Sequence, residues 1–387
     1  MNILIITQSL SGGGAEKVAA NLSLGLSQTE NVYVLTYETL KNEYEHSGFR
    51  IDINSASTTV CGKIYQSIRR IVMLSLIKNK YRIDKSISFV PQCDYANILS
   101  SYFSKAEAVV EVSSNMSVAF PYGLSRWFRR FILSRAGKLA VVSNGSKIDL
   151  VNNWKIPTSK ITTIYNSIDF KSIKARLSEE HASHMEGEYI ISMGSFRKPK
   201  GHWHLIKSFA CVKEQIPNLK LVILGDGAYR QKYEELAKNL GIDDSVIMPG
   251  FASNPYSYIS KSVCMVFPSV YEGFGNAIIE AMICGVPVIS TDCDFGPREI
   301  LAPETDPSAK TNDVEYAEYG VLVPSFDMSD IDISTSISHK EMILSRAIVD
   351  LYKSIEIREH YTEKASEYCK RFANDVFTNK WISLLHK

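Results

Sequence analysis

The sequence lacks any regular pattern of cysteines. It contains seven, an odd number, and they are scattered without a Cys-x-x-Cys pair. Such spacing indicates neither a disulfide framework nor a zinc site. We therefore expect the protein to reside in a reducing cytosol.

Long hydrophobic runs are also missing. No apolar segment approaches the roughly 20 residues that a membrane-spanning helix needs. Residues 1–7 lack the basic segment that precedes the apolar core of a signal peptide. We expect a protein that is not integral to a membrane.

Acidic residues are scarce in the first half of the chain. Although the net charge is only +1, residues 1–168 carry 19 Lys and Arg against 11 Asp and Glu, or +8, and the remainder carries −7. A basic half of this kind favours an anionic partner, either a nucleic acid or a membrane surface. No recognised nucleic-acid motif accompanies the charge, so we expect no nucleic-acid partner.

Two segments of this half combine basic residues with an apolar helical period. Residues 53–81 contain no acid but five Lys and Arg flanking apolar positions, and residues 125–135 add aromatic residues to four arginines. Each segment is compatible with a core helix whose basic residues are solvated, and equally with a helix that lies on a membrane surface. The sequence leaves both alternatives open.

Composition and periodicity predict a two-domain α/β protein. The chain has 387 residues, of which 45% are hydrophobic and 22% charged, as in ordinary soluble proteins. Apolar strands alternate with helix-length segments, and the cycle restarts near residue 189, which predicts two parallel sheets covered on both faces. The polar stretch 171–187 is predicted to be a linker. Helices close the chain at residues 339–353, 355–371 and 375–385.

One stretch places two carboxylates across a glycine turn. Glu272 precedes Gly273-Phe274-Gly275, and Glu280 lies within the helix that this turn opens. Backbone N–H groups and the dipole at a helix N-terminus favour a phosphate there. A glycine loop at residues 12–14 could touch a ligand in the same way, or could be only a turn.

Cations lie at a strand end of the same half. Arg197, Lys198 and Lys200 follow the strand near residue 190, where open α/β sheets bind ligands. Such charges can stabilise a diphosphate leaving group without a metal. Two Asp-x-Asp spacings, at residues 292–294 and 330–332, lack further ligands nearby, so we expect no metal site and no cofactor. The segment 303–318 is predicted to be an insertion loop rather than a site.

The motif Glu272-Gly273-Phe274-Gly275, followed by Glu280-Ala281-Met282 and Gly285-Val286-Pro287-Val288-Ile289, resembles the donor-site signature of glycosyltransferase family 4. Members of that family are retaining enzymes of the GT-B fold, with two Rossmann-like domains facing each other across a cleft. The resemblance covers nearly the whole chain. It implies an acceptor-side domain over residues 1–168, a nucleotide-sugar domain over residues 169–372, and a last helix, within residues 373–387, that packs back on the first domain.

The resemblance implies roles for individual residues. Glu280 matches the carboxylate that holds the ribose, Glu272 the one that holds the donor sugar, and Lys200 the lysine that binds the diphosphate. Gly14 would close over the phosphates from the first domain. The candidate catalytic residues are Glu272, Lys200 and Arg197. The implied donor-binding residues are Gly14, Ser195, Arg197, Lys200, Glu272, Gly273, Phe274, Gly275, Asn276, Ala277 and Glu280.

Two departures from the family pattern concern the groups near the sugar. Gly194-Ser195 stands where the family often has Gly-Arg, so Arg197 is the candidate for the second cation. Many members carry a histidine in the first domain, where this chain offers Ser114 or Asn115 as acceptor-side candidates.

The sequence therefore predicts a retaining, metal-independent glycosyltransferase. It would move a hexose or N-acetylhexosamine from a nucleotide diphosphate sugar, UDP-sugar being favoured, to a saccharide acceptor. The basic first half favours a lipid-linked acceptor and a peripheral position on the cytoplasmic face of the inner membrane. A GT-B nucleotide-sugar 2-epimerase and a catalytically silent sugar-nucleotide-binding module are the alternatives.

Overall fold

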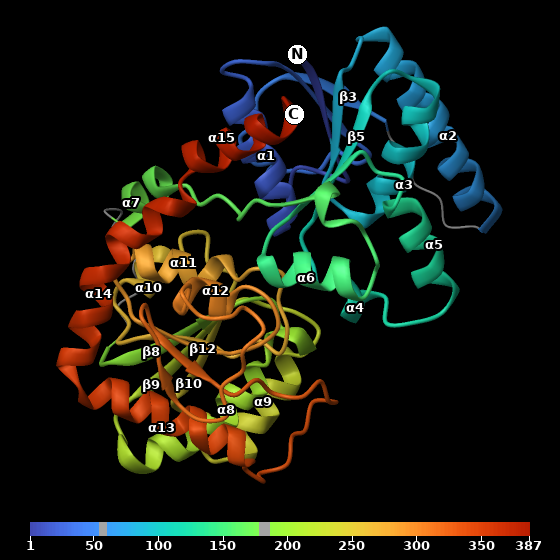
Figure 1. The fold of residues 1–387 in the computed structure, drawn as a ribbon. Coiled ribbons are helices and arrows are strands. Elements are labelled where there is room, and N and C mark those ends of the chain that lie inside the picture. The colour runs from blue at the N-terminus through green and yellow to red at the C-terminus, as the bar shows by residue number, and fades with distance from the viewer. Residues whose placement is uncertain (54–59, 178–185) are drawn as a thin grey trace. The chain divides into compact units, whose positions relative to one another are not determined.

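The computed structural model describes residues 1–53, 60–177 and 186–387. They form two compact units (Figure 1). Unit 1 comprises Met1–Ser167 together with Asn374–Lys387, and unit 2 comprises Ile168–Ala373. None of the helices in the described ranges is both long and apolar enough to cross a lipid bilayer.

Unit 1 is built on a seven-stranded parallel sheet with the order β3-β2-β1-β4-β5-β6-β7. Its strands are β1 (Asn2–Thr7), β2 (Asn31–Thr36), β3 (Phe49–Asp52), β4 (Lys85–Ser88), β5 (Glu107–Val112), β6 (Lys138–Val141) and β7 (Ile161–Thr163). Its helices are α1 (Gly14–Leu26), α2 (Val60–Lys80), α3 (Pro91–Ser100), η1 (Ser101–Phe103), α4 (Met116–Ala119), α5 (Leu124–Leu133), α6 (Asn144–Asn152), η2 (Thr158–Lys160) and α15 (Asn374–Leu385).

Helices cover both faces of this sheet because its strands are apolar on both sides. Successive residues of a strand point to opposite faces. Ile3 and Ile5 of β1 pack in one cluster with residues of α1 and α15, whereas Leu4 and Ile6 pack in another with residues of α2 and α3. The near-continuous hydrophobic runs of the sequence follow from this double coverage.

The last helix, α15, belongs to the core of unit 1. Trp381 is buried, and its ring centroid lies 6.0 Å from that of Phe89, next to β4. Lys138 Nζ, at the start of β6, donates to the carbonyl of Leu384 at 2.9 Å. The end of the chain thus completes the face of the sheet that α1 covers.

Unit 2 repeats the architecture, with the order β10-β9-β8-β11-β12-β14-β13, in which β13 alone is antiparallel. Its strands are β8 (Tyr189–Met193), β9 (Lys220–Leu224), β10 (Val246–Gly250), β11 (Met265–Phe267), β12 (Val288–Thr291), β13 (Glu315–Tyr316) and β14 (Val321–Val323). Its helices are α7 (Phe170–Leu177), η3 (Lys198–Lys200), α8 (His202–Gln215), α9 (Arg230–Asn239), α10 (Tyr256–Ile259), α11 (Asn276–Ile283), α12 (Pro297–Leu301), α13 (His339–Lys353), α14 (Ile355–Cys369) and η4 (Lys370–Phe372).

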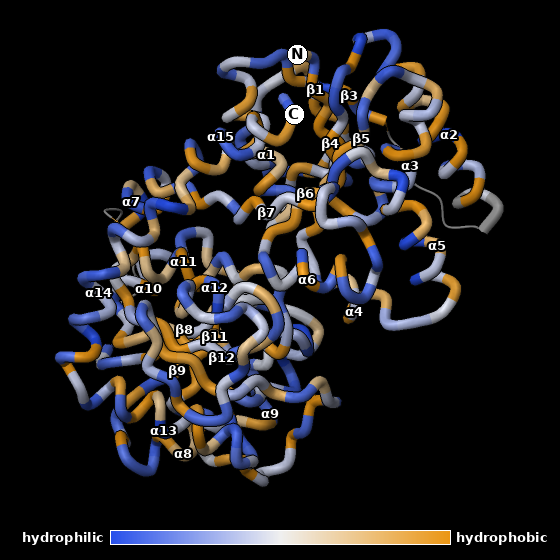
Figure 2. The backbone as a smooth tube through the Cα atoms, in the orientation of Figure 1, coloured by the Kyte–Doolittle hydropathy of each residue, from blue (hydrophilic) through white to orange (hydrophobic). Residues whose placement is uncertain are grey.

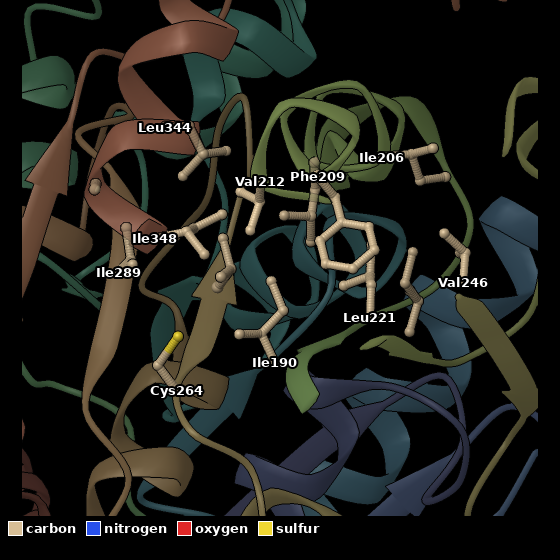
Figure 3. Packing of buried hydrophobic residues seen from close by; sticks show 14 of the residues in the cluster. Ile190, Ile206, Phe209, Val212, Leu221, Val246, Cys264, Ile289, Leu344 and Ile348 are labelled. Carbon is tan, nitrogen blue, oxygen red and sulfur yellow. The ribbon is translucent and has the colours of Figure 1, made fainter. Parts of the chain in front are cut away.

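The main core of unit 2 lies between the sheet and helices α8, α9 and α13 (Figure 3). Phe209 of α8 is fully buried among Ile190 and Leu221 of the strands, and Leu344 and Ile348 of α13 close the same cluster. The helix α13 begins with a capping box in which Ser338 and Glu341 satisfy each other's backbone N–H groups. Its bounds agree with the prediction for residues 339–353.

Two predictions for this unit were wrong. The polar stretch predicted as a linker contains helix α7, whose Ile173 is buried while its Lys and Arg side chains face outward. The remainder of that stretch includes residues 178–185, which lie outside the described residues. The segment predicted as an insertion loop contains β13, whose Glu315 accepts from Arg298 Nη2 at 2.7 Å. In both cases a polar composition concealed a short ordered element.

A buried lysine joins the helices of unit 1. Lys78 of α2 donates from Nζ to the carbonyl of Asn97 at 2.7 Å, to Asn97 Oδ1 at 3.0 Å and to Ser101 Oγ at 2.9 Å. Burial lowers the pKa of Lys78 to about 7. α2 is therefore fixed to the end of α3 and to η1 by a group that is costly to charge.

We predict that Lys78 makes the free energy of unfolding depend on pH. Between about pH 7 and pH 10 the unfolded chain holds the Lys78 proton more firmly than the folded chain, so the free energy of unfolding rises with pH. Lys78→Met should remove roughly 1 kcal/mol or more of this rise, measured by urea unfolding across the range. Lys80→Met, at an exposed position of the same helix, is the control and should keep the slope.

Candidate functional site

Loops that follow the parallel strands of unit 2 meet at one edge of its sheet. The loop after β8 is joined to the loop after β9 by Phe196 N–H, which donates to the carbonyl of Asp226 at 2.9 Å. It is joined to the loop after β11 by Val270 N–H, which donates to the carbonyl of Pro199 at 2.8 Å. Because such edges bind ligands in open α/β sheets, this edge is the candidate site.

An ion pair lies at the centre of this edge. Lys200 Nζ donates to Glu272 Oε1 at 2.6 Å, and Ser269 Oγ donates to the same oxygen at 2.8 Å. Both charged side chains are partly buried. The pair brings together two residues 72 positions apart in the chain, the predicted diphosphate lysine and the predicted sugar carboxylate.

A glycine makes this approach possible. Gly201 has φ +63°, and a Cβ at this position would lie 2.1 Å from the carbonyl oxygen of Pro268. Only glycine therefore lets the backbone after Lys200 touch the backbone that leads to Glu272. The sequence pattern alone does not reveal this contact, because Gly201 and Pro268 are far apart in the chain.

Helix α11 begins beside Glu272. Gly275 is its N-cap with φ +101°, a left-handed conformation that favours glycine. Phe274 is buried, and its ring centroid lies 5.7 Å from that of Phe372. Asn276 and Ala277 form the first turn and are partly exposed. The positive end of the helix dipole thus lies next to the Lys200–Glu272 pair.

Glu280 is placed one turn further along α11 and is 9% exposed. Burial first, and then the charge of Glu280, raise the pKa of Cys284 to about 12 and the pKa of Tyr256 well above its usual range. A carboxylate kept in such surroundings needs polar partners. Glu280, the fifth of the eight residues of α11, is the residue to which the family resemblance assigns the ribose.

The three cations of the loop after β8 differ in their surroundings. Lys198 pairs with Asp330, and Lys200 pairs with Glu272. Arg197 is exposed, and its Nε donates to the neutral hydroxyl of Ser195 at 2.9 Å. The structure thus places Ser195, Arg197 and Lys200 in one loop, with Arg197 at its outer surface.

The acidic pairs of the sequence are engaged by cations. Asp292 is buried and accepts from Arg298 Nη2 at 2.7 Å, and Asp294 pairs with Lys310 at 2.9 Å. Asp332 pairs with Lys207, which is itself buried. Among the residues that the structure describes, no group of three or more His, Cys, Asp or Glu side chains is arranged to hold a metal ion.

The candidates of unit 1 lie at the carboxyl ends of its own strands. Gly14 is the first residue of α1. Asn115 is buried and caps α4, because its Oδ1 accepts from Val118 N–H at 3.1 Å. Ser114 is partly exposed in the loop between β5 and α4. All three residues belong to unit 1.

Sequence reasoning missed a buried acid in unit 1. Glu111, inside β5, is 4% exposed, and neither carboxyl oxygen has a hydrogen-bond partner among the described residues. Burial, and secondarily the charge of Asp94, raise the pKa of Glu111 well above its usual range. The signal was available, since Glu111 lies between Val110 and Val112 in the apolar part of β5.

Solved structures identify the fold. The structure of Anabaena HepE in complex with UDP and glucose superposes with a TM-score of 0.78 at 16% identity, covering 100% of this chain and 99% of that one. WaaG, described as a glycosyltransferase involved in lipopolysaccharide biosynthesis, gives a TM-score of 0.69. The predicted GT-B fold is thereby confirmed.

Sequence similarity identifies the domain that carries the candidate site. Residues 173–316 match the family described as glycosyl transferases group 1, so this chain contains a glycosyltransferase group 1 domain. An uncharacterized glycosyltransferase of Methanocaldococcus jannaschii is 36% identical over 199 residues, which are 51% of this chain and 49% of that protein. The chain thus spans about half the length of that relative.

A second relative aligns over nearly its whole length. The N-acetylgalactosamine-N,N'-diacetylbacillosaminyl-diphospho-undecaprenol 4-alpha-N-acetylgalactosaminyltransferase of Campylobacter jejuni is 28% identical over 382 residues, which are 95% of this chain and 94% of that protein. The family match and the names of these relatives support the prediction of a glycosyltransferase.

We predict that Gly201→Ala will destabilise unit 2 by about 2 kcal/mol or more, because it adds steric overlap with Pro268 to the cost of a left-handed alanine. Gly241→Ala is a matched control, since Gly241 has φ +68° and nothing within 4 Å of its Cβ position. The control should cost only about 1 kcal/mol in urea unfolding. Equal losses in the two variants would show that the contact with Pro268 is unimportant.

Proposed function

We propose that the protein is a retaining glycosyltransferase that uses a nucleotide diphosphate sugar as donor. The enzyme would transfer a hexose or N-acetylhexosamine to a saccharide acceptor that is linked to a lipid. This reaction would belong to the assembly of a surface polysaccharide or glycan. The observation that carries the proposal is the Lys200–Glu272 ion pair beside the N-terminus of α11. It brings together a cation that can bind a diphosphate and a carboxylate that can bind sugar hydroxyls, at the carboxyl ends of the strands of unit 2.

In this proposal Lys200 binds the diphosphate of the donor. The charge on that diphosphate grows as the bond to the sugar breaks, and a cation held in place stabilises it more than a mobile one. The ion pair with Glu272 already fixes the Lys200 side chain, so little reorganisation is needed. Arg197, at the surface of the same loop, is the second cation. The same charges would make a metal unnecessary.

The two glutamates divide the rest of the donor between them. Glu272 accepts from Lys200 and Ser269 through Oε1, which leaves Oε2 as the oxygen proposed to accept from hydroxyls of the sugar. Glu280 would accept from the ribose hydroxyls. The backbone N–H groups of Phe274, Gly275, Asn276 and Ala277 would line the sugar and the diphosphate. No protein nucleophile is invoked, because the acceptor would attack on the face from which the diphosphate departs.

Relatives support the finer parts of this proposal. The name of the Campylobacter jejuni protein describes transfer of N-acetylgalactosamine to a saccharide on diphospho-undecaprenol, which is a lipid carrier. The structures of Anabaena HepE include complexes with UDP and with UDP-glucose. We therefore propose a UDP-sugar donor and a lipid-linked acceptor. The roles of Gly14, Ser114 and Asn115 stay predictions from the family resemblance.

Nucleotide binding tests the residue roles. Glu280→Ala should weaken UDP and the matching UDP-sugar alike, by about 10- to 100-fold, because a charged hydrogen-bond acceptor is lost from both. Glu272→Gln should weaken the UDP-sugar by a similar factor and leave UDP within about threefold. Titration calorimetry measures both, with Glu359→Ala at an exposed site as the control. If Glu280→Ala binds UDP as wild type does, the site assignment is wrong.

Incubation with donor alone tests the reaction class. A transferase should release little UDP until a saccharide acceptor is added, and the linkage in the product should retain the anomeric configuration of the donor. The measurement is NMR of the sugar, after thermal shift with a panel of nucleotide-sugars has identified the donor. An epimerised donor would instead establish the isomerase, and tight binding without turnover on any lipid-linked acceptor would favour the silent module.

A further inference from the structure

Helix α5 exposes most of its apolar side chains. Leu124, Trp127, Phe128 and Phe131 are between 40% and 79% exposed, whereas Ile132 and Leu133 at the end of the helix are buried. Tyr122, in the loop before α5, is 81% exposed. A core helix would bury these aromatic residues, so the structure excludes the core alternative for α5. α5 presents an apolar surface outward.

Helix α2 has a second exposed apolar stripe. Ile64, Ile68, Val72 and Leu76 follow one another at intervals of four residues, and each is between 51% and 60% exposed. This spacing places them along one side of the helix. The opposite side, which includes Leu74 and Ile77, is buried in unit 1.

These surfaces belong to one side of unit 1. α3 contacts both α2 and α5, and Asn79 Nδ2 of α2 donates to the carbonyl of Phe103 in η1 at 2.9 Å. Figure 2 shows hydrophobic residues along both α2 and α5. We define the α2–α5 face as the exposed side chains of α2, of η1 and of residues 122–131. Of the 21 large hydrophobic residues that are exposed in the described chain, twelve lie on this face.

The charge on the α2–α5 face has one sign. No acidic residue occurs between Asp52 and Asp84, or between Glu111 and Asp149. α5 and the residue that follows its C-cap carry four arginines, of which Arg130 and Arg135 are exposed. Apolar contact area and positive charge therefore coincide, as in helices that lie in a membrane interface.

Some of the basic residues hold the face in place. Arg129 of α5 donates from Nη2 to the buried Asp94 of α3 at 2.6 Å. Arg126 donates from Nη1 to the carbonyl of Pro121 at 2.9 Å, which fixes the loop before α5. The face is thus a rigid part of unit 1, and Arg130 is left to contact a partner.

We propose that the α2–α5 face docks on the surface of an anionic lipid bilayer, with Trp127, Phe128 and Leu124 entering the interface. A bilayer of negative charge neutralises the arginines while it covers the apolar side chains. A second copy of the chain fits less well, because self-association through this face would bring like charges together. The proposal does not depend on the proposed donor site, since it concerns a different unit of the protein.

Tryptophan fluorescence tests the contact directly. Trp127 is the exposed tryptophan of the four in the chain, because Trp154, Trp203 and Trp381 are buried. Vesicles of phosphatidylglycerol and phosphatidylcholine should shift its emission to shorter wavelength and protect it from iodide. Brominated lipids should quench it. Binding to vesicles of phosphatidylcholine alone should be weaker by a factor of about ten or more. Salt should weaken binding, because the Debye length falls from about 10 Å at 0.1 M to about 3 Å at 1 M.

Two variants separate the apolar and the electrostatic parts. Phe128→Ala combined with Leu124→Ala should weaken vesicle binding about tenfold while keeping the Trp127 signal. Arg130→Glu should weaken it by a similar factor only on anionic vesicles. Phe251→Ala and Lys364→Glu, at exposed positions of unit 2, are the matched controls and should bind as wild type does. Circular dichroism checks that each variant is folded.

Several results would overturn the proposal. These are the absence of binding to anionic vesicles at low salt, binding in which Trp127 stays open to iodide, and equal losses in the controls. A dimer in solution that protects Trp127 without lipid would assign the face to a second copy instead. Loss of nucleotide binding would leave this test unaffected, so the two proposals fail independently.

Discussion

The ion pair between Lys200 and Glu272 is the interaction on which the candidate site depends. A partly buried lysine and a partly buried glutamate each bear a cost of desolvation, which a bond of 2.6 Å offsets. The loops that carry them can approach only because Gly201 lies against the carbonyl of Pro268. The two loops are therefore held together by contacts within the protein.

Buried charge organises other parts of unit 2 in the same way. Arg298 joins Asp292, at the end of β12, to Glu315 of the antiparallel β13, so that the sheet edge next to the site is closed by two carboxylates and one guanidinium. In the sequence, Asp292 belonged to an Asp-x-Asp spacing that was not expected to bind a metal, and Glu315 belonged to a segment predicted to be a loop. Removing Arg298 would leave the buried Asp292 without a cation, which is far more costly than losing a surface pair.

The regular parts of the fold were predictable from the sequence. The bounds of α13 agree with the prediction because an apolar period and a capping box coincide there, and the alternation of strands and helices predicted the two sheets. Helix α7 was missed because a single buried residue, Ile173, is too weak a period to detect. Local pattern predicted the loop of Lys200 and the turn of Glu272, but not the contact between them, which depends on tertiary structure. The direction in which α5 faces could not be predicted either, since the apolar side of an amphipathic helix can face the core or lie on a membrane surface, and the sequence alone does not distinguish the two.

The position of α15 has a consequence for how the protein is made. The first 167 residues leave the ribosome without Phe377 and Trp381, which belong to the same hydrophobic cluster as α1 and β1. All of unit 2, residues 168–373, is synthesised before them, which takes about 10–40 s at roughly 5–20 residues per second. During that interval one face of the nascent sheet lacks its cover. The half of the molecule that is translated first therefore cannot complete its hydrophobic cluster until the other half has been synthesised.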